Sequence, residues 1–360
     1  MSHSTSPAAQ SATGGSTSGG RRILLTGVTG FLGQAVLRSL LETTQDVHVT
    51  AVVRPKGSVT GRKRLEQLLR KPVFSSWADL LTAEGSDESP VDGRARLKEI
   101  FDTRVGVLEG DLTDMPEITD PFDTVIHSAS SVSFDPPIDE AFRTNVGGAQ
   151  NLYEALLASG QDPHVIHVST AYVGGISKGL RQEGSLQADV DWRAEYEAAL
   201  AARARVEAES RKPETLRSQI RAAKGRVGRM GPKTVAAVSE DARREWVDER
   251  LIDFGRTRAQ SVGWTDIYTF TKAMAEQVAE ELWAGNGHRV SFVRPSIIES
   301  AMTKPFPGWI DGYKVADPLI MAYGRGLLPE FPGLPDSVLD IVPVDTVVNT
   351  TLAVAATPPP

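Results

Sequence analysis

Short apolar segments alternate with longer amphipathic segments along most of this chain. The apolar segments are predicted to be buried strands, and they occupy residues 21–27, 47–54, 123–130, 163–170 and 288–296. Between them, residues 31–42 and 137–159 place apolar side chains at helical spacing. This alternation is typical of an α/β fold in which helices cover both faces of a doubly wound parallel sheet.

One long segment interrupts the alternation. Residues from about 178 to 262 are rich in Ala, Arg and Glu. Two stretches within them, 191–210 and 238–260, have the character of helices. The sequence therefore predicts a helical insertion within a domain that covers residues 21–360.

The two ends of the chain differ from the rest in composition. Ser, Thr, Gly and Ala dominate the first twenty residues, which lack the apolar core of a secretory signal. Such a segment cannot bury enough surface to offset the entropy of ordering, so residues 1–20 are predicted to be a disordered tail. The Pro-rich end, 357–360, is typical of a linker, and a further C-terminal region is expected beyond it.

Composition excludes several classes of protein. The net charge of −7 argues against a general nucleic-acid binder. The sequence contains no run of 18 apolar residues, so no membrane span is expected and a cytoplasmic protein is predicted. The absence of Cys excludes disulfides, thiolate metal sites and a Cys nucleophile. His164 and His167 lie in a predicted strand and are interpreted as structural, so no metal site is predicted.

Positive charge gathers in one part of this acidic chain. Residues 201–233 contain ten Lys and Arg against three Glu. A solvated helical surface would explain this excess. The alternative is a lid that meets something anionic: the phosphates of a bulky substrate, an acidic carrier protein or a membrane surface.

A glycine-rich turn links the first predicted strand to the first predicted helix. In such a turn the first Gly allows the bend, the second lets the backbone approach a pyrophosphate, and the third lets the helix pack on the strand. The pyrophosphate then lies at the helix N-terminus, where free N–H groups point toward it. Because the context is a strand, a turn and a helix, the sequence predicts a Rossmann-type nucleotide site. Its residues are Thr26, Gly27, Thr29, Gly30, Phe31, Leu32 and Gly33.

The end of the second strand indicates which cofactor binds. An acidic residue there would hold the ribose 2′-hydroxyl of NAD, whereas this chain has Arg54 and Lys56. Cations suit a 2′-phosphate, so NADPH is predicted. Arg62 and Arg64 would either assist these two residues or be ordinary surface charges.

A second turn is also a candidate for contact with the cofactor. Asp111 and Leu112 follow another expected strand in the sequence GDLTD. A short turn at this place would border the adenine. An Asx turn without any ligand role fits the spacing equally well.

A phenol and an amine lie four positions apart in a later predicted helix. Tyr268 and Lys272 would share one helical face. A nearby ammonium is expected to lower the pKa of a phenol, ordinarily about 10, and to bind the nicotinamide ribose. Ser169 and Thr170 end a predicted strand, where open α/β sheets bind ligands, and would hold a substrate carbonyl. The four residues predict an acid–base site beside a nicotinamide.

Six segments give the chain a more specific resemblance. They are LLTGVTGFLG, VIHSASSVSFD, HVSTAYVGG, GWTDIYTFTKAMAEQ, VRPSIIESAMTKPFPGWIDGYKVADPLI and DIVPVDTVVN. Together they resemble the extended short-chain dehydrogenase/reductases and, within them, the fatty acyl-CoA reductases, especially the bacterial alcohol-forming type. The resemblance extends over residues 21–349, and its most specific part is the stretch that contains PFPGWIDG.

The resemblance implies roles for individual residues. The acid–base pair of the family falls on Tyr268 and Lys272, and its hydroxyl falls on Thr170 with Ser169 beside it. Residues 296–340 would form a smaller substrate-binding part, in which Trp309 and Tyr313 would line an acyl tunnel. Further contacts around the cofactor are implied for Ala129, Asn145, Lys272, Pro295 and Ser296.

The resemblance also implies a reaction. NADPH would reduce a long-chain acyl-CoA to aldehyde and then to alcohol, and without a Cys the hydride must reach the thioester directly. The alternatives are a reductase that releases aldehyde from a carrier-protein thioester, a nucleotide-sugar or sterol dehydrogenase or epimerase, and a non-catalytic NADPH-binding protein. The expected partners are acyl-CoA or an acyl carrier protein, with peripheral membrane contact as a further alternative and no nucleic acid.

Overall fold

The computed structural model describes most of the chain after the predicted tail. It covers residues 20–85, 91–177, 179, 182–186, 189–227, 231–312, 316–330 and 338–359. Residues 1–19 of the predicted tail and Tyr313 therefore lie outside the described residues. Within these ranges, no helix combines the length and the apolarity needed to cross a bilayer.

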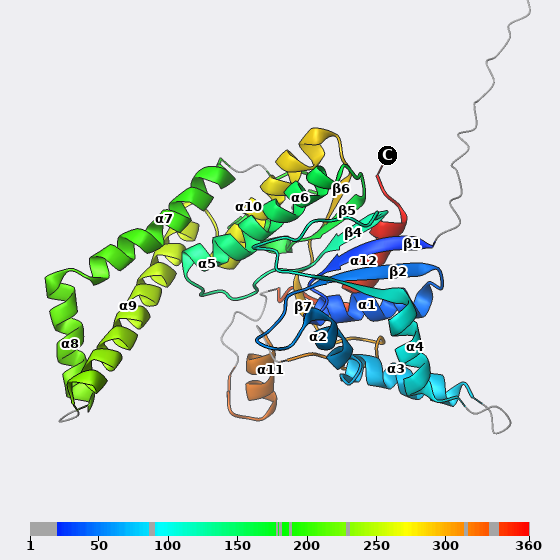
Figure 1. Ribbon diagram of the computed structural model, residues 1–360, viewed down its shortest axis with the longest axis horizontal. Helices are drawn as coiled ribbons and strands as arrows, with labels where there is room; N and C mark the ends of the chain where they lie inside the picture. Colours follow the sequence, from blue (N-terminus) through cyan, green and yellow to red (C-terminus); the bar gives the residue numbers. More distant parts are fainter. Residues whose placement is uncertain are drawn as a thin grey trace, which may run out of the picture.

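Six parallel strands form the central sheet, in the order β3-β2-β1-β4-β5-β6 (Figure 1). They are β1 (Arg21–Thr26), β2 (Val47–Val53), β3 (Val105–Glu109), β4 (Thr124–His127), β5 (His164–Val168) and β6 (Val290–Val293). The order reverses between β1 and β4, so the carboxyl ends of these strands open a crevice suited to a ligand. The sheet confirms the predicted α/β fold, and all five predicted strands belong to it.

Helices cover both faces of the sheet because side chains alternate along each strand. Ile23 and Leu25 of β1 face one core, and Leu24 faces the other. The first core includes α1 (Phe31–Thr43), α2 (Gly61–Leu68), α3 (Pro72–Ala83), α4 (Gly93–Arg104) and α12 (Val344–Ala356). The second core includes α5 (Ile138–Phe142), α6 (Gly148–Ser159) and α10 (Ile267–Leu282).

The segment of the predicted insertion forms a helical arm. Its helices are α7 (Trp192–Ser210), α8 (Pro213–Val227) and α9 (Pro232–Ser261), and the arm projects away from the sheet (Figure 1). Helices α7 and α9 contain the two stretches for which helices are predicted, whereas α8 lies outside both. Helices α8 and α9 pack against each other, as do α7 and α9 near the base of the arm.

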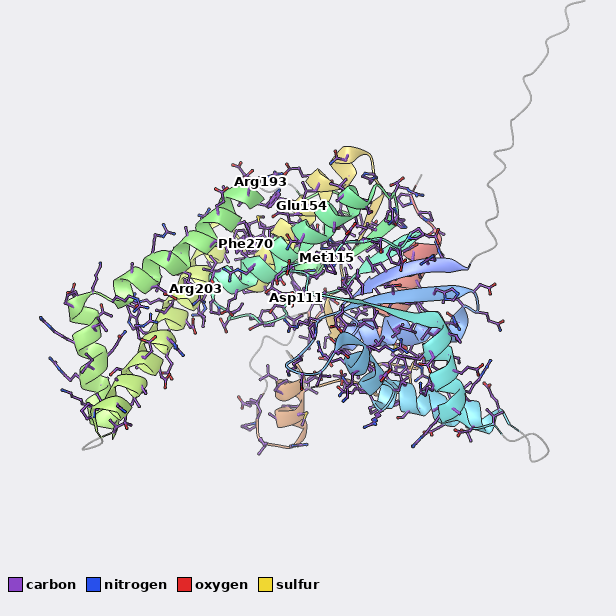
Figure 2. The ribbon with its side chains drawn as sticks, viewed as in Figure 1. Asp111, Met115, Glu154, Arg193, Arg203 and Phe270 are labelled. Carbon is purple, nitrogen blue, oxygen red and sulfur yellow. The ribbon has the colours of Figure 1, made fainter. Side chains whose placement is uncertain are left out.

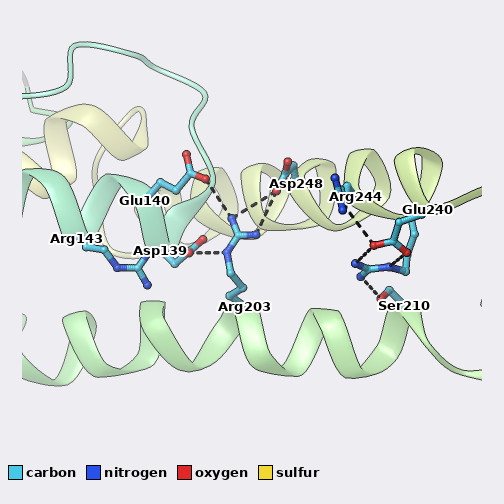
Figure 3. Close-up of polar contacts among 9 residues, drawn as sticks. Asp139, Glu140, Arg143, Arg203, Ser210, Glu240, Arg244 and Asp248 are labelled. Atoms are coloured by element: carbon cyan, nitrogen blue, oxygen red, sulfur yellow. Dashed lines mark hydrogen bonds and ion pairs between the residues drawn. The ribbon is translucent and has the colours of Figure 1, made fainter. Parts of the chain in front are cut away.

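Ion pairs anchor the arm to α5 (Figure 3). Nε of Arg203 in α7 lies 2.6 Å from Oδ2 of Asp139, whose side chain is completely buried. The same guanidinium lies 3.3 Å from carboxylate oxygens of Glu140 and, on α9, of Asp248. Because desolvating a carboxylate is costly, the buried Asp139 needs this partner. The anchor therefore fixes the arm to the helix that continues through a π-helical turn, η1 (Arg143–Gly147), into α6.

The basic stretch 201–233 runs from α7 through α8. Arg203 is used in the anchor, but Arg217, Arg221 and Lys224 are exposed and share one face of α8. A solvated surface and a contact with an anionic partner both remain predictions for this stretch.

A smaller unit follows β6. Strands β7 (Ile297–Glu299) and β8 (Ile341–Pro343) pair in parallel, and α11 (Asp317–Gly324) lies in the connection between them. This unit occupies the segment for which the substrate-binding part is predicted. Short helical turns, η2 (Ala171–Gly174) and η3 (Ala284–Asn286), follow β5 and α10 respectively.

Candidate active site

The glycine-rich turn has the close backbone approaches that its sequence predicts. Gly27 has a φ of +77°, and a Cβ there would lie 2.7 Å from the backbone nitrogen of Ala129. A Cβ on Gly33 would lie 2.2 Å from the carbonyl oxygen of Gly27. Gly30 is the N-cap of α1 and provides no side-chain cap, so the first N–H groups of the helix are left for another acceptor. This arrangement fits the pyrophosphate of a dinucleotide.

Strand β4 supplies the neighbouring wall of the turn. The Ala129 backbone N–H donates to Oγ1 of Thr26 at 3.2 Å, and the Ser128 hydroxyl donates to the Thr26 carbonyl at 2.8 Å. Nδ1 of His127 lies 2.8 Å from the same Thr26 hydroxyl. Burial, with a smaller contribution from Lys272, lowers the pKa of His127 to about 3, so this ring is neutral. Thr26 and Ala129, both predicted cofactor residues, thus meet directly.

Arg54 and Asp111 meet at the carboxyl edge of the sheet, where Figure 2 labels Asp111. Nη1 of Arg54 lies 3.3 Å from Oδ2 of Asp111, and the Arg54 side chain is 70% exposed. Asp111 also accepts hydrogen bonds from the backbone and hydroxyl of Thr113, which makes it an Asx turn. Arg64 donates to the Arg54 carbonyl at 2.5 Å, whereas Arg62 is directed to Asp102 at 2.8 Å. Arg54 and Lys56, which both follow β2, are thus exposed cations at this edge.

Helix α10 carries the predicted acid–base pair. Asp266 caps the helix by accepting from the Thr269 backbone N–H at 2.8 Å, and this cap sets the start of the helix directly before Tyr268. The Tyr268 ring meets the Phe134 ring edge to face, with 5.6 Å between centroids. Nζ of the buried Lys272 donates to the carbonyl oxygen of Val168 at 2.6 Å. The pair therefore lies beside the carboxyl end of β5.

The electrostatics of the pair differ from the expectation. Burial, and then Asp266, raises the pKa of Tyr268 to about 12, so the predicted lowering of the phenol pKa is wrong for this structure. The ammonium that was expected to favour the phenolate donates instead to the Val168 carbonyl. Burial also lowers the pKa of Lys272 to about 8, against the opposing effect of Glu276. A phenol that stays protonated near neutral pH is suited to donate a hydrogen bond and a proton.

Thr170 and Ser169 follow β5, as predicted, and lie against the end of β6. The Thr170 hydroxyl donates to the Pro295 carbonyl at 3.3 Å and caps η2 by accepting from the Tyr172 backbone N–H. Oγ of the buried Ser169 has no hydrogen-bond partner in the described part of the chain. The structure thus brings Thr170 and Pro295 together and places Ser296 next in the chain, at the entry to β7.

Asn145 lies in the π-helical turn η1 and links two parts of the site. Its Oδ1 accepts from the Ser131 backbone N–H at 2.7 Å, and its Nδ2 donates to the Thr271 hydroxyl at 2.9 Å. Thr271 directly precedes Lys272. Asn145 therefore links the loop after β4 to α10, and its contact with the cofactor remains a prediction. Such π-helical turns are frequent at functional sites.

Three features of the region could not be read from sequence patterns. Phe134 contacts Tyr268 from a loop without periodicity. Burial and a hydrogen bond with Asp317 raise the pKa of Glu299 to about 7. Trp309 is buried against Phe31 of α1, with 4.9 Å between ring centroids, so it contacts the glycine-rich turn. Its predicted place in an acyl tunnel remains a prediction.

Comparisons with known proteins give a consistent result. Residues 25–351 match the family described as Male sterility protein. Fatty acyl-CoA reductase 2, chloroplastic, of Arabidopsis thaliana is 30% identical over 344 residues, which cover 94% of this chain and 51% of that protein. Fatty acyl-CoA reductase 2 of Homo sapiens is 29% identical over 341 residues, which cover 93% of this chain and 54% of that protein. The chain thus spans about half the length of the curated relatives it matches.

The solved structures that are similar share the fold. The terminal R domain from the myxalamid PKS-NRPS biosynthetic pathway superposes with a TM-score of 0.55 at 18% identity. The superposition covers 95% of this chain and 63% of that domain. At this level of identity the likeness concerns the fold alone.

Proposed function

Because this chain belongs to the fatty acyl-CoA reductases of the extended short-chain dehydrogenase/reductase superfamily, we propose that it reduces long-chain acyl-CoA with NADPH. The product would be the aldehyde and, after a second reduction, the alcohol. The observation that carries the proposal is the hydrogen bond of Lys272 to the carboxyl end of β5, directly before Ser169 and Thr170, with Tyr268 one turn earlier in the same helix.

The residues of the turn and of the edge fit a dinucleotide with a 2′-phosphate. The uncapped N-terminus of α1 would bind the pyrophosphate, since its N–H groups and the helix dipole favour an anion. Arg54 would bind the 2′-phosphate, for which its exposed guanidinium can leave Asp111. Lys272 would hydrogen-bond the nicotinamide ribose. NADPH is preferred to NADH in this proposal because the end of β2 offers a cation where NAD enzymes use an acid.

Three side chains would take part in the reaction. The bound cofactor supplies a hydride to the carbonyl carbon. Tyr268 and Thr170 would donate hydrogen bonds to the oxygen on which negative charge develops. The C–S bond then breaks, CoA leaves as a thiolate that takes up a proton, and aldehyde remains. In the second reduction Tyr268 would give its proton to the alkoxide. The positive charge of Lys272 would then stabilise the phenolate until Tyr268 takes up a new proton.

Exposed apolar side chains near Tyr268 support an apolar substrate. Val132 and Phe134 in the loop after β4 are 43% and 40% exposed, and Ile176 after η2 is 68% exposed. Of these residues, Phe134 touches the ring of Tyr268, so it offers apolar surface beside the proposed proton donor. An acyl chain lying on these residues would bury them when the thioester is in place.

The proposal is tested by mixing the purified protein with NADPH and palmitoyl-CoA and following cofactor absorbance and products. Two NADPH consumed per CoA released, with hexadecanol formed, is the expected result. One NADPH per CoA, with aldehyde accumulating, would restrict the proposal to its first step. Turnover of the same acyl group only on a carrier protein, and not on CoA, would contradict the acyl-CoA assignment.

The pH dependence follows from the shifted pKa of Lys272. Burial favours the neutral amine, so the ammonium is lost as pH rises through about 8 rather than through 10.5. We expect kcat/KM for NADPH to fall over that range, while Tyr268 remains protonated up to about pH 12. Lys272→Arg keeps its charge and should lose this alkaline fall, even if its rate is lower. An identical fall in wild type and Lys272→Arg would contradict the assignment.

A further inference from the structure

We infer that Asp311 is a positioning residue for the glycine-rich turn, acting through Gln34, and that the loop 300–312 thereby sets the affinity for NADPH. This inference rests on the proposed function only in the identity of the cofactor. It assigns the PFPGWIDG stretch to cofactor binding, in addition to any contact with an acyl chain.

The first step is the contact between Gln34 and the turn. Gln34 lies in the first turns of α1 and is completely buried. Its Nε2 lies 3.1 Å from the carbonyl oxygens of both Thr29 and Gly30. One side-chain amide therefore holds the two residues that precede the helix, which are the residues closest to a pyrophosphate at its N-terminus.

Asp311 strengthens the orientation of this amide. Its Oδ2 accepts from the same Nε2 of Gln34 at 2.6 Å, the shortest of the three contacts. A carboxylate accepts hydrogen bonds and donates none, so it selects the NH₂ group of Gln34 over the amide oxygen. Oε1 of Gln34 has no partner in the described ranges, so the orientation is set by the three acceptors around Nε2: Asp311 and the two carbonyl oxygens of the turn. With the amide reversed, its oxygen would face the two carbonyl oxygens of the turn and repel them.

A second contact comes from the same loop. Trp309 is 3% exposed and stacks at a tilt on Phe31, the first residue of α1. Trp309 and Asp311 are two residues apart, and both contact the first four residues of the helix. The loop thus supports the turn at two points.

The loop is itself held in place. Oδ atoms of Asp345, at the start of α12, accept from the backbone N–H groups of Met302 at 3.1 Å and Thr303 at 2.9 Å. Within the loop, the Ala301 N–H donates to the Trp309 carbonyl at 3.0 Å. These bonds fix the loop to the start of α12 and hold its own backbone in place.

Lys71 balances the charge of Asp311. Its Nζ lies 2.7 Å from Oδ2 of Asp311. An unpaired carboxylate near the N-terminus of α1 would compete with a bound phosphate for the positive end of the helix dipole. With Lys71 present, Asp311 can orient Gln34 without opposing an anionic ligand.

The test is the dissociation constant of NADPH, measured by fluorescence titration of the intact protein without any acyl substrate. Asp311→Asn and Gln34→Met are each expected to weaken NADPH binding by roughly 5–20-fold, since the first removes the carboxylate that favours the NH₂ group of Gln34 and the second removes the hydrogen bonds of Gln34 to the turn. The double variant should bind no more weakly than the weaker single variant, because both changes break one chain of contacts. At saturating NADPH, kcat should stay within about twofold of wild type.

Lys304→Met is the matched control. Lys304 belongs to the same loop and pairs with Glu42 of the same helix at 3.4 Å, but Glu42 lies at the far end of α1 from the turn. The control should bind NADPH like wild type. Thermal unfolding of each variant separates a loss of affinity from a loss of folding, and Gln34→Met carries the same expectation if Asp311→Asn folds poorly.

Two results would overturn the inference. One is a wild-type NADPH affinity in folded Asp311→Asn and Gln34→Met. The other is an equal loss of affinity in Lys304→Met, which would mean that any loosening of the loop has the same effect. Wild type could bind NADPH normally, and the two variants more weakly, while wild type does not turn over acyl-CoA. That result would support this inference and contradict the proposed function.

Discussion

Tyr268→Phe is expected to lower kcat about 10²–10⁴-fold, the usual contribution of a positioned proton donor. Phe keeps the edge-to-face contact with Phe134, so the surroundings of the ring should not change. The pKa of about 12 means that wild-type Tyr268 carries its proton throughout the physiological range, and the variant has no proton to give. Steady-state rates at saturating NADPH and acyl-CoA measure the effect.

The affinity for NADPH and a control variant separate chemistry from binding. The dissociation constant of NADPH should change little in Tyr268→Phe, because the ring remains and only the hydroxyl is lost. Tyr196→Phe removes a hydroxyl from α7 in the arm and is expected to leave kcat within about threefold. A Tyr268→Phe enzyme that keeps more than about a tenth of kcat would show that another group supplies the proton.

Arg203→Met is expected to lower the free energy of unfolding by about 3 kcal/mol, because it leaves the buried carboxylate of Asp139 without its main partner. This value is at the low end for breaking a buried pair, since Nη1 of Arg143 remains 3.5 Å from Asp139. Urea denaturation followed by circular dichroism measures the change. Because Asp139 begins the helix that leads into η1, we also expect the arm to become more sensitive to proteolysis.

A surface pair on the same arm provides the control. Arg226 and Glu245 lie 3.8 Å apart, and both side chains are 65% exposed. Arg226→Met should therefore change stability by less than about 1 kcal/mol. Equal effects of the two substitutions would mean that Asp139 does not depend on Arg203, and that the arm is held by its apolar contacts alone.

The fold could be predicted where the sequence has a strong local pattern. The five predicted strands are continuous apolar runs because both faces of the sheet are covered, and α7 and α9 show their helical character directly. Strands β7 and β8 have three residues each and show no pattern that a sequence reader can use. Helix α8 begins at Pro213, and this Pro separates it from α7 within a uniformly polar segment.

The candidate site could be predicted as a set of residues but not as a set of contacts. The glycine spacing and the four-residue separation of Tyr268 from Lys272 are local signals, and they indicate two segments without showing what each segment contacts. The partner of Lys272 is a backbone carbonyl 104 positions away, and Gln34 meets Asp311 across 277 positions. Burial that arises only in the folded chain raised the pKa of Tyr268, which reversed the direction expected from the nearby ammonium.

The central claim is that hydride passes from NADPH directly to the acyl carbon at the site formed by Tyr268, Lys272 and Thr170. It is tested most directly by incubating the protein with palmitoyl-CoA and NADPH that carries two deuterium atoms at C4 of the nicotinamide, followed by mass spectrometry of the product. We predict two deuterium atoms at C1 of hexadecanol, or one in hexadecanal if reduction stops there, and neither product in Tyr268→Phe over the same time. A reduced product without deuterium at C1 would contradict it.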